Sequence, residues 1–587
     1  MFDHPALSQQ IITYLGNKRR LLPFIWQSVT EILRKEGWEP RLRRAPQTPR
    51  GEFAPRAEAA GGEEFGPRAQ LMPRAEAAGG EEPPLAFVDA FAGSGVVSRM
   101  ARLAGFEVVA NDLEPYCEPL LRPFLELEPE GVDALFAPVA GGLGLRGVSP
   151  YAETLTWLNH LEAPDSPEKE HFARHYAPRQ TAAPDLDGER LFYSRENALR
   201  IDAILAALEG EPFAPPLVRE TVLASLLYEM SVHINTSGVM KGFHRGWGGR
   251  RGDALARILG PIELRPLPLI GGPRGEVTTL AAEELFEQAR VPEAQIIYAD
   301  PPYTVHQYGA NYHLLNTATL ADRYDPGPLS LGSRAGIRRD HNRSDFCRST
   351  REGGVRACEA AFERFVRSAR GRYLLVSYNT DGLIPPERMV TLLSRSGRNR
   401  VEARVQDHVK FRGGKNTQSE RKTREVLYTV ELDRPAPAAQ TVDLIGRLER
   451  EERLSRLLDS YIDPRRLPWG AQRRERGQWL LTDPEGVPIL TLRRDFRLLE
   501  VYPAGRRSLH RIEAARVEKR EVMERYIEEG MVREALELLP SFKIEKYRHL
   551  FERYARLIET LASPEERSKV AQLESSYGFT AGRARRS

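Results

Sequence analysis

Four short apolar segments, each with a polar residue at or near its end, constrain the fold of this chain most strongly. They are LAFVDAF at 85–91, FEVVAND at 106–112, QIIYAD at 295–300 and RYLLVSYN at 372–379. Their length and their β-branched and aromatic content are typical of buried strands, and the stretches between them carry helical patterns. Strands that alternate with helices join through right-handed crossovers into a mainly parallel sheet with helices on both faces. The sequence therefore predicts an open α/β domain.

The composition excludes several classes of protein. The 587 residues are 41% hydrophobic and 28% charged, as in an ordinary soluble globular protein, and no apolar run reaches the ~18 residues of a membrane span. The N-terminus has no basic stretch followed by an apolar core, so we expect no signal peptide and a cytoplasmic protein. The three cysteines, Cys117, Cys347 and Cys358, contain no C-x-x-C pair, so we expect neither a disulfide framework nor a zinc site. The net charge of +3 does not by itself indicate nucleic-acid binding.

Two changes in pattern divide the chain. Residues 40–84 contain PRAEAAGGEE at 55–64 and again at 73–82. Such a repeat has too few large apolar residues to offset chain entropy, so we predict a disordered insertion. After about residue 440, the segment 479–502 indicates a three-stranded meander and 508–562 indicates amphipathic helices.

The first apolar segment runs into DAFAGSG at 89–95, where Gly93 and Gly95 let the backbone approach a ligand at the start of a helix. Asp112 ends the next strand, where a carboxylate can accept both hydroxyls of a ribose. The pattern lacks G-x-G-x-x-G, so a nucleoside without phosphate, such as S-adenosylmethionine, fits better than a dinucleotide. Taken alone, the Gly-x-Gly pattern is equally compatible with a structural turn.

The motif ADPPY at 299–303 is the sharpest functional signal. Two consecutive prolines serve a sheet poorly, because proline cannot donate to the ladder. The Asp300 carboxylate and the Pro301 carbonyl can each accept one hydrogen of an exocyclic base amine, which turns its lone pair toward a sulfonium methyl. Pro302 stiffens this turn, and Tyr303 can stack on the base. The motif predicts direct methyl transfer without a strong general base.

The segment YLGNKRRLL at 14–22 places Tyr14, Asn17 and Lys18 at the start of a helix. A basic first turn opposes the helix dipole, so Lys18 is expected to face an anion such as the carboxylate of the cofactor. A simple helix-capping turn is the alternative.

Together these motifs resemble the DPPY-type adenine-specific DNA methyltransferases, which include the DNA adenine methylase type of restriction-modification systems. The resemblance spans roughly residues 8–432 and extends to NTSG at 235–238, SDFC at 344–347, VSYNTDGLIP at 376–385 and the basic segment HVKFRGGKNTQSERKTREVLYTV at 408–430. It implies a Rossmann-like, S-adenosylmethionine-dependent enzyme that methylates N6 of adenine in double-stranded DNA. It also implies a cognate restriction or defence protein as a candidate partner, and no metal.

The resemblance assigns roles to individual residues. Cofactor contacts would come from Tyr14, Asn17, Lys18, Asp89, Phe91, Gly93, Gly95 and Asp112. The target adenine would be held by Asp300, Pro301, Pro302 and Tyr303. Such enzymes often carry an acidic residue after a strand before DPPY, whereas this chain reads GEVTTLAAEEL at 275–285, and Thr278, Thr279 and Glu276 stay open as its replacement.

An enzyme that rotates an adenine out of the duplex needs a firm hold on the DNA backbone. Basic residues cluster at 241–251, among glycines and aromatic residues, and again at 410–424. Solvated charge runs are the alternative for both clusters. The candidate phosphate contacts are Lys241, Arg245, Arg250, Arg251, Lys410, Arg412 and Lys415.

The expected organisation follows from these assignments, and two other functions stay open. We expect an N-terminal cofactor-binding segment at 1–39, followed by the repeat insertion at 40–84. The catalytic domain is expected in two parts, at 85–118 and 271–435, with a DNA-recognition subdomain inserted between them at 119–270. An α+β domain of unknown role is expected at 440–587. An RNA base methyltransferase and a non-catalytic DNA-binding protein on a methyltransferase fold are the alternatives.

Overall fold

The structure of the chain is a computed structural model. It describes residues 1–8, 18–39, 84–249, 254–288, 291, 294–330, 333–348, 353–409, 422–458, 460–473, 478–493, 496–542 and 547–576. The predicted insertion at 40–84 therefore lies outside the described residues, except for residue 84. The same holds for seven of the candidate site residues, namely Tyr14, Asn17, Arg250, Arg251, Lys410, Arg412 and Lys415.

The described residues fall into two compact units, one within 1–436 and the other within 437–587. Each unit has its own cluster of buried apolar side chains. The boundary lies close to the change in pattern that the sequence shows near residue 440.

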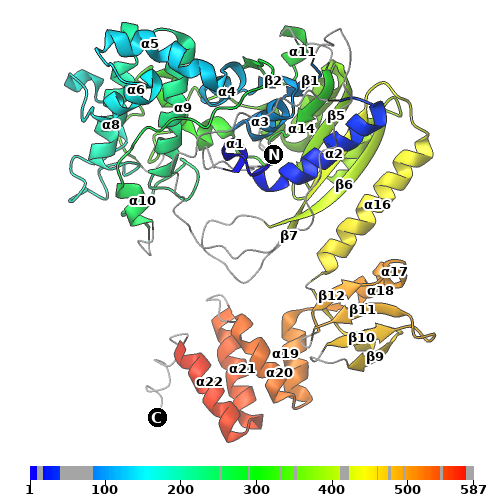
Figure 1. Cartoon of the computed structure of the whole chain (residues 1–587). Helices are drawn as coiled ribbons and strands as arrows, with labels where there is room; N and C mark the ends of the chain where they lie inside the picture. Colours follow the sequence, from blue (N-terminus) through cyan, green and yellow to red (C-terminus); the bar gives the residue numbers. More distant parts are fainter. Residues whose placement is uncertain are drawn as a thin grey trace. The chain divides into compact units, whose positions relative to one another are not determined.

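Seven strands form the sheet of the first unit. They are Ala86–Asp89 (β1), Glu107–Asn111 (β2), Glu276–Thr278 (β3), Ala294–Ala299 (β4), Gly371–Asn379 (β5), Arg400–Val409 (β6) and Lys422–Glu431 (β7). Their order is β3-β2-β1-β4-β5-β7-β6 (Figure 1). Strands β1 to β5 run parallel, and β7 is antiparallel to both of its neighbours. The four predicted strands are confirmed as β1, β2, β4 and β5, whereas β3 and the β6–β7 pair were not predicted.

The path of the chain through the sheet determines where a ligand can bind. From β1 the chain moves outward to β2 and β3, and then returns across the sheet to β4 and β5. The carboxyl ends of β1 and β4 therefore lie side by side at the point where the strand order reverses, because Asp89 pairs with Tyr298. Open α/β sheets bind their ligands at this point.

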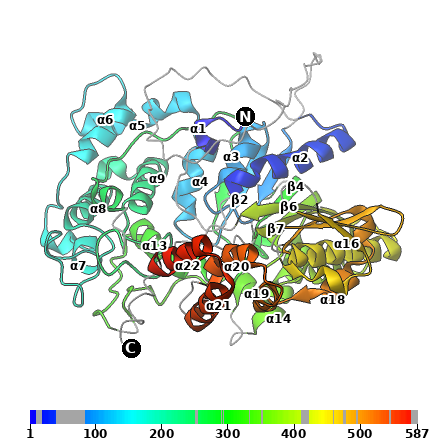
Figure 2. The ribbon, with the colours of Figure 1, turned by 90° about the horizontal axis from the view of Figure 1, so that it is seen from below.

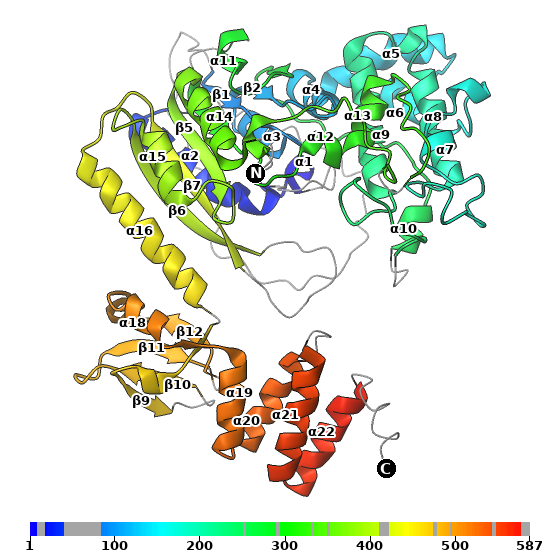
Figure 3. The same cartoon turned by 180° about the vertical axis from the view of Figure 1, so that it is seen from behind.

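Helices cover both faces of the sheet, as predicted. Helices Leu22–Glu36 (α2) and Val96–Leu103 (α3) cover the face of the sheet that is turned to the viewer in Figure 1. Helices Gly354–Ser368 (α14) and Pro386–Ser394 (α15) cover the opposite face, which Figure 3 shows. In α2 the buried side chains recur every three or four residues, which is the amphipathic pattern that the sequence shows. It ends at Gly37, which has a φ of +67°.

The long interval between β2 and β3 is helical. Its helices are Cys117–Glu126 (α4), Val132–Gly142 (α5), Pro150–Asn159 (α6), Phe172–His175 (α7), Arg195–Ala207 (α8), Pro216–Val232 (α9) and Leu255–Leu259 (α10). They gather on one side of the sheet (Figure 2). Their apolar side chains belong to the same buried cluster as those of β1 and β2. The interval is thus a helical layer that shares its core with the sheet, and its DNA-recognition role stays a prediction.

Short helices complete the first unit around the strand ends. Before the sheet comes Pro5–Ser8 (α1), and a 3₁₀ turn at Lys18–Leu21 leads directly into α2. The segment Leu285–Gln288 (α11) precedes β4. The helices Tyr308–Asn311 (α12) and His313–Leu320 (α13) follow it.

The second unit combines a small sheet with helices, which confirms the α+β prediction. Strands Gly470–Arg473 (β9), Trp479–Thr482 (β10), Pro488–Leu492 (β11) and Leu498–Val501 (β12) form an antiparallel meander, with β9 added to the three predicted strands. Strands Tyr461–Ile462 (β8) and Arg516–Val517 (β13) pair separately. The helices are Ala438–Leu457 (α16), Pro503–Arg506 (α17), Leu509–Ala514 (α18), Lys519–Glu528 (α19), Val532–Leu538 (α20), Arg548–Leu561 (α21) and Pro564–Ser576 (α22). Among all described helices, none has the length and apolarity to span a membrane.

Candidate active site

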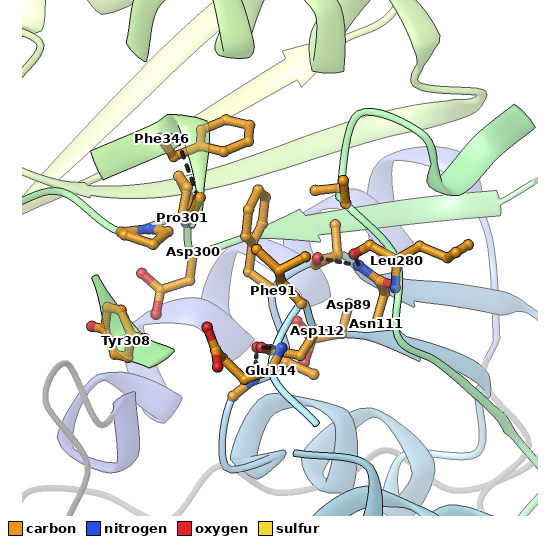
Figure 4. A pocket seen from close by; sticks show the side chains of 18 of the residues that line it. Asp89, Phe91, Asn111, Asp112, Glu114, Leu280, Asp300, Pro301, Tyr308 and Phe346 are labelled. Carbon is orange, nitrogen blue, oxygen red and sulfur yellow. Dashed lines mark hydrogen bonds between the residues drawn. The ribbon is translucent and has the colours of Figure 1, made fainter. Parts of the chain in front are cut away.

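A pocket of about 300 Å³ opens at the carboxyl ends of β1, β2 and β4 (Figure 4). The walls come from residues 89–94, 96–97, 111–114, 280–284, 298, 300–303 and 343–346, together with Lys18 and Tyr308, so the predicted cofactor residue Gly95 is not part of the lining. The volume is at the lower end of the range typical of small-molecule sites. The pocket brings together the Gly-rich turn, the Asp112 strand end and the DPPY motif, as the sequence predicts.

The Gly-rich turn is fixed by two carboxylates. The Ser98 hydroxyl donates to Oδ2 of Asp89 over 2.6 Å. The amide of Gly93 donates to Oδ2 of Asp112 over 2.8 Å, and the amide of Glu114 donates to Oδ1 over 3.0 Å. A carboxylate oxygen can accept more than one hydrogen bond, so a ligand hydroxyl can also donate to Asp112. Burial raises the pKa of Asp112, and these amide hydrogen bonds oppose the rise.

Gly95 is required at the start of α3 by its conformation and by its surroundings. Its φ of +76° lies in the left-handed region, and a Cβ at this position would lie 2.5 Å from a methyl group of Leu121. The glycine therefore lets α3 begin directly behind the pocket wall.

The pocket wall beside β2 is held in place by hydrogen bonds of Asn111, not by an acidic residue. The Asn111 side-chain amide donates to the carbonyls of Ala90 and Leu280, and its Oδ1 accepts from the Thr278 hydroxyl and the Leu280 amide. Thr278 thus holds Asn111, and Glu276 is exposed at the start of β3. The pocket lining after β3 consists instead of residues 280–284, which include two carboxylates that the sequence analysis did not single out, Glu283 and Glu284.

Asp300 reaches into the pocket immediately after β4. Figure 4 shows its carboxylate on the side of Tyr308, across the pocket from Asp89 and Asp112. Its Oδ1 lies 3.0 Å from the ammonium of Lys18, and its side chain is 17% exposed. Burial raises the pKa of Asp300 to about 7, and the Lys18 ammonium opposes this rise.

The ammonium of Lys18 lies between two carboxylates. Besides Asp300, it contacts Oε1 of Glu425 on β7 at 2.7 Å. The Ser377 hydroxyl of β5 donates to the same Oε1 over 2.7 Å. Burial disfavours the charged ammonium, but Asp300 and Glu425 outweigh this effect and raise the pKa of Lys18 well above its ordinary value. Lys18 is therefore part of the site, and its predicted contact with a cofactor carboxylate stays a prediction.

Aromatic side chains form the apolar part of the pocket. The ring of Phe91 packs edge-on against Phe346, with centroids 5.0 Å apart. Tyr303 is half-buried, packs edge-on against Tyr378, and lies 5.8 Å from the Lys18 ammonium. Tyr308 stacks on Tyr312 behind it. These rings offer flat surfaces to a planar ligand.

Glu114 is a pocket residue that the sequence analysis missed. It is 4% exposed, and its Oε2 accepts from the Asn316 side-chain amide of α13 over 2.8 Å. Burial raises the pKa of Glu114 to about 8. Its place two residues after Asp112 was the available signal, because that short distance keeps it at the same strand end.

The pocket lining is strongly acidic. It contains seven carboxylates, from Asp89, Asp112, Glu114, Glu283, Glu284, Asp300 and Asp345, against the two basic side chains of Lys18 and Arg343. Such a lining disfavours a polyphosphate and favours a ligand with positive charge. Among the described residues, no group of three or more histidine, cysteine or carboxylate side chains is placed to hold a metal ion.

Two of the candidate DNA contacts lie in the described part of the chain. Lys241 is half-buried, and burial lowers its pKa. Arg245 is 72% exposed and forms an ion pair with Asp187. Their segment is linked to the region after DPPY, because the amide of Met240 donates to the carbonyl of Asn311. The other five candidates lie outside the described residues.

Comparison with known proteins finds a family match within the first unit. Residues 84–326 match the family described as D12 class N6 adenine-specific DNA methyltransferase. The type II methyltransferase M.NlaIII of Neisseria lactamica is 28% identical over 316 residues, which are 53% of this chain and 80% of that protein. The type II methyltransferase M.CviAII of Paramecium bursaria Chlorella virus 1 is 26% identical over 337 residues, which are 56% and 84% of the two chains.

A further relative matches over a smaller share of its own length. The type II methyltransferase M.FokI of Planomicrobium okeanokoites is 28% identical over 315 residues, which are 53% of this chain and 43% of that protein. No solved structure matches the chain significantly.

Proposed function

Because the chain belongs to the D12 class N6 adenine-specific DNA methyltransferases, we propose that its pocket holds S-adenosylmethionine beside the target adenine and that Asp300 directs the methyl transfer between them. The single observation that carries this proposal is the position of the Asp300 carboxylate. It reaches into the same pocket that the Gly-rich turn and Asp112 line.

The residues of the pocket fit this cofactor. Its sulfonium and its ammonium are cations, and the lining has seven carboxylates against two basic side chains. Oδ1 of Asp89 is buried and accepts no hydrogen bond within the described part of the chain, so a ligand donor can satisfy it. Asp112 would accept the ribose hydroxyls, and Gly93 would admit the cofactor close to the backbone, while Gly95 lets α3 begin behind the pocket wall. Phe91 would pack against it.

The cofactor supplies a methyl group that its sulfonium already activates, so the protein needs to orient the amine rather than to activate it strongly. We propose that the Asp300 carboxylate and the Pro301 carbonyl each accept one hydrogen of the adenine N6 amine. The nitrogen lone pair then forms the new N–C bond, and the electron pair of the broken C–S bond stays on sulfur. One proton leaves the resulting cationic nitrogen, and the Asp300 carboxylate is placed to accept it.

The remaining residues of the motif would hold the base. Pro302 limits the motion of the turn after β4, and Tyr303 offers its ring for stacking on the adenine. The amide of Leu383 donates to the carbonyl of Tyr303 over 3.0 Å, which fixes the end of the motif on the segment after β5. This geometry would keep the acceptors and the stacking ring in constant positions.

The substrate is DNA, and we propose that it is double-stranded. An adenine in a duplex must leave the stack to reach this pocket, at a cost of a few kcal/mol, which DNA contacts have to offset. The proposed contact regions are the helical layer at 119–270, with Lys241 and Arg245, and the basic residues at 410–424. We place the enzyme in the cytoplasm and propose a cognate restriction or defence protein as its partner, because three relatives are named type II methyltransferases.

The experiment that tests this function follows a labelled methyl group from S-adenosylmethionine. The chain is incubated with genomic DNA, and in parallel with total RNA, each with a matching nuclease control. We expect label in DNA alone, at N6 of adenine within a fixed sequence. Label in RNA, or on cytosine, would contradict the proposal, and so would the absence of label in any nucleic acid.

A further inference from the structure

We propose that Glu425 is a positioning residue of the reaction: it holds the Lys18 ammonium from the other side, so that Lys18 does not weaken the catalytic Asp300 carboxylate as a hydrogen-bond acceptor for the adenine. This inference rests on the proposed role of Asp300. Glu425 lies on β7, far from the sequence motifs that the pocket brings together.

The Glu425 side chain contacts one residue of the pocket, Lys18, and one residue of β5, Ser377. Its Oε1 lies 2.7 Å from Nζ of Lys18 and accepts from the Ser377 hydroxyl over 2.7 Å. Both Glu425 and Lys18 are buried, with side chains only 3% and 5% exposed. A buried carboxylate costs solvation free energy unless close partners compensate it, and here the only cation within ion-pair distance that the described residues show is Lys18.

The charges of the three residues explain what this arrangement achieves. Lys18 and Asp300 alone would form a neutral pair, and an ammonium bonded to Asp300 weakens that carboxylate as an acceptor. Glu425 balances the ammonium from the other side, so the three groups together carry one negative charge. The adenine nitrogen becomes cationic when it takes the methyl group, and a net negative site stabilises that cation.

A second lysine–glutamate pair on the same strand provides a matched comparison. Glu431 of β7 accepts from the ammonium of Lys35 over 2.7 Å and is 5% exposed. Like Lys18, Lys35 comes from the N-terminal segment of the chain. Unlike Lys18, Lys35 does not line the pocket, so this pair connects the same parts of the fold without reaching Asp300.

The test compares Glu425→Gln with Glu431→Gln in single-turnover methylation of adenine in DNA across pH 5–9. Loss of the Glu425 charge strengthens the pairing of Lys18 with Asp300, so the pH at which the rate reaches half of its maximum should fall by about one unit. The maximal rate should fall roughly 10-fold, because a weaker base is a weaker acceptor. Cofactor affinity should stay within about 2-fold. Glu431→Gln should leave the midpoint unchanged, whatever it does to the melting temperature.

A further pair of variants separates the charge of Glu425 from its packing. Glu425→Asp keeps the charge and should keep the wild-type midpoint, even at a lower rate. In a Lys18→Met background the two carboxylates face each other without a cation, so Glu425→Gln should no longer slow the reaction. If the Lys18→Met protein is too inactive to measure, the pH midpoint of the Glu425→Gln variant alone tests the proposal.

Three results would overturn the role of Glu425. One is an unchanged midpoint in a folded, active Glu425→Gln variant, and another is an equal loss of rate from Glu425→Gln in both Lys18 backgrounds. The third is a loss of cofactor binding in a folded Glu425→Gln protein, which would place the residue in the cofactor site. A wild-type chain that does not methylate adenine would contradict the proposed function instead, so the two failures are distinguishable.

Discussion

The ammonium of Lys18 lies 3.0 Å from Oδ1 of Asp300, and this ion pair joins the N-terminal segment of the chain to the strand end that carries the DPPY motif. The pair explains why the basic turn before α2 is tolerated. A buried lysine in the first turn of a helix is unfavourable unless anions surround it, and here two carboxylates do so.

The pH dependence of the reaction should report the Asp300 carboxyl. Burial raises its pKa to about 7, and only the ionised form can accept a hydrogen of the amine without donating one. The rate of single-turnover methylation should therefore rise with pH through about 7 and then level off. A rate that is constant between pH 5 and 8 under conditions where cofactor and DNA stay bound would show that no such ionisation controls the step.

Gly95→Ala should destabilise the first unit and weaken cofactor binding. The new Cβ would meet a methyl group of Leu121 at 2.5 Å, and the backbone would stay in the left-handed region. Together these effects should lower the free energy of unfolding by about 2–4 kcal/mol. Gly37→Ala is the control, because Gly37 also has a positive φ but no atom within 4 Å of its Cβ position. Chemical denaturation should show the larger loss at Gly95, and equal losses would rule out the steric account.

Removal of the charges at Lys241 and Arg245 should weaken DNA binding and reduce its dependence on salt. Each phosphate contact that is lost lowers the slope of log K against log salt by about 0.9, so the double alanine variant should lose up to about two units of slope. Arg179→Ala is a control, since Arg179 is an exposed arginine of the same helical layer, with a side chain 86% exposed. An unchanged slope in the double variant would remove the 241–245 segment from the interface.

The strands and the main catalytic motif could be predicted because their signals are local. Each of β1, β2, β4 and β5 is a short apolar run that ends in polar residues, and parallel strands place such ends at one edge of the sheet. The approach of Asp89, Asp112 and Asp300 to one pocket follows from that rule. The meander of the second unit has a similarly local pattern of short strands and turn residues.

Glu425 could not be predicted, because its role depends on which side chains of distant segments meet it. In the sequence Glu425 is an acidic residue among basic ones, and no local pattern singles it out. Only the pairing of β7 with β5 brings it to Ser377 and Lys18. For the same reason, the sequence could not predict that the Thr278 hydroxyl donates to Asn111 of the neighbouring strand, or that residues 280–284 line the pocket.

Asp300→Ala tests the central claim most directly, with methyl transfer to DNA adenine and cofactor affinity measured on the same protein. The side chain is only one of several groups around the cofactor pocket, so the dissociation constant for S-adenosylmethionine should change by less than about 5-fold. The rate should fall by at least about 10²-fold, because the amine loses the acceptor that orients it and takes its proton. Methylation at the wild-type rate by this variant would contradict the account.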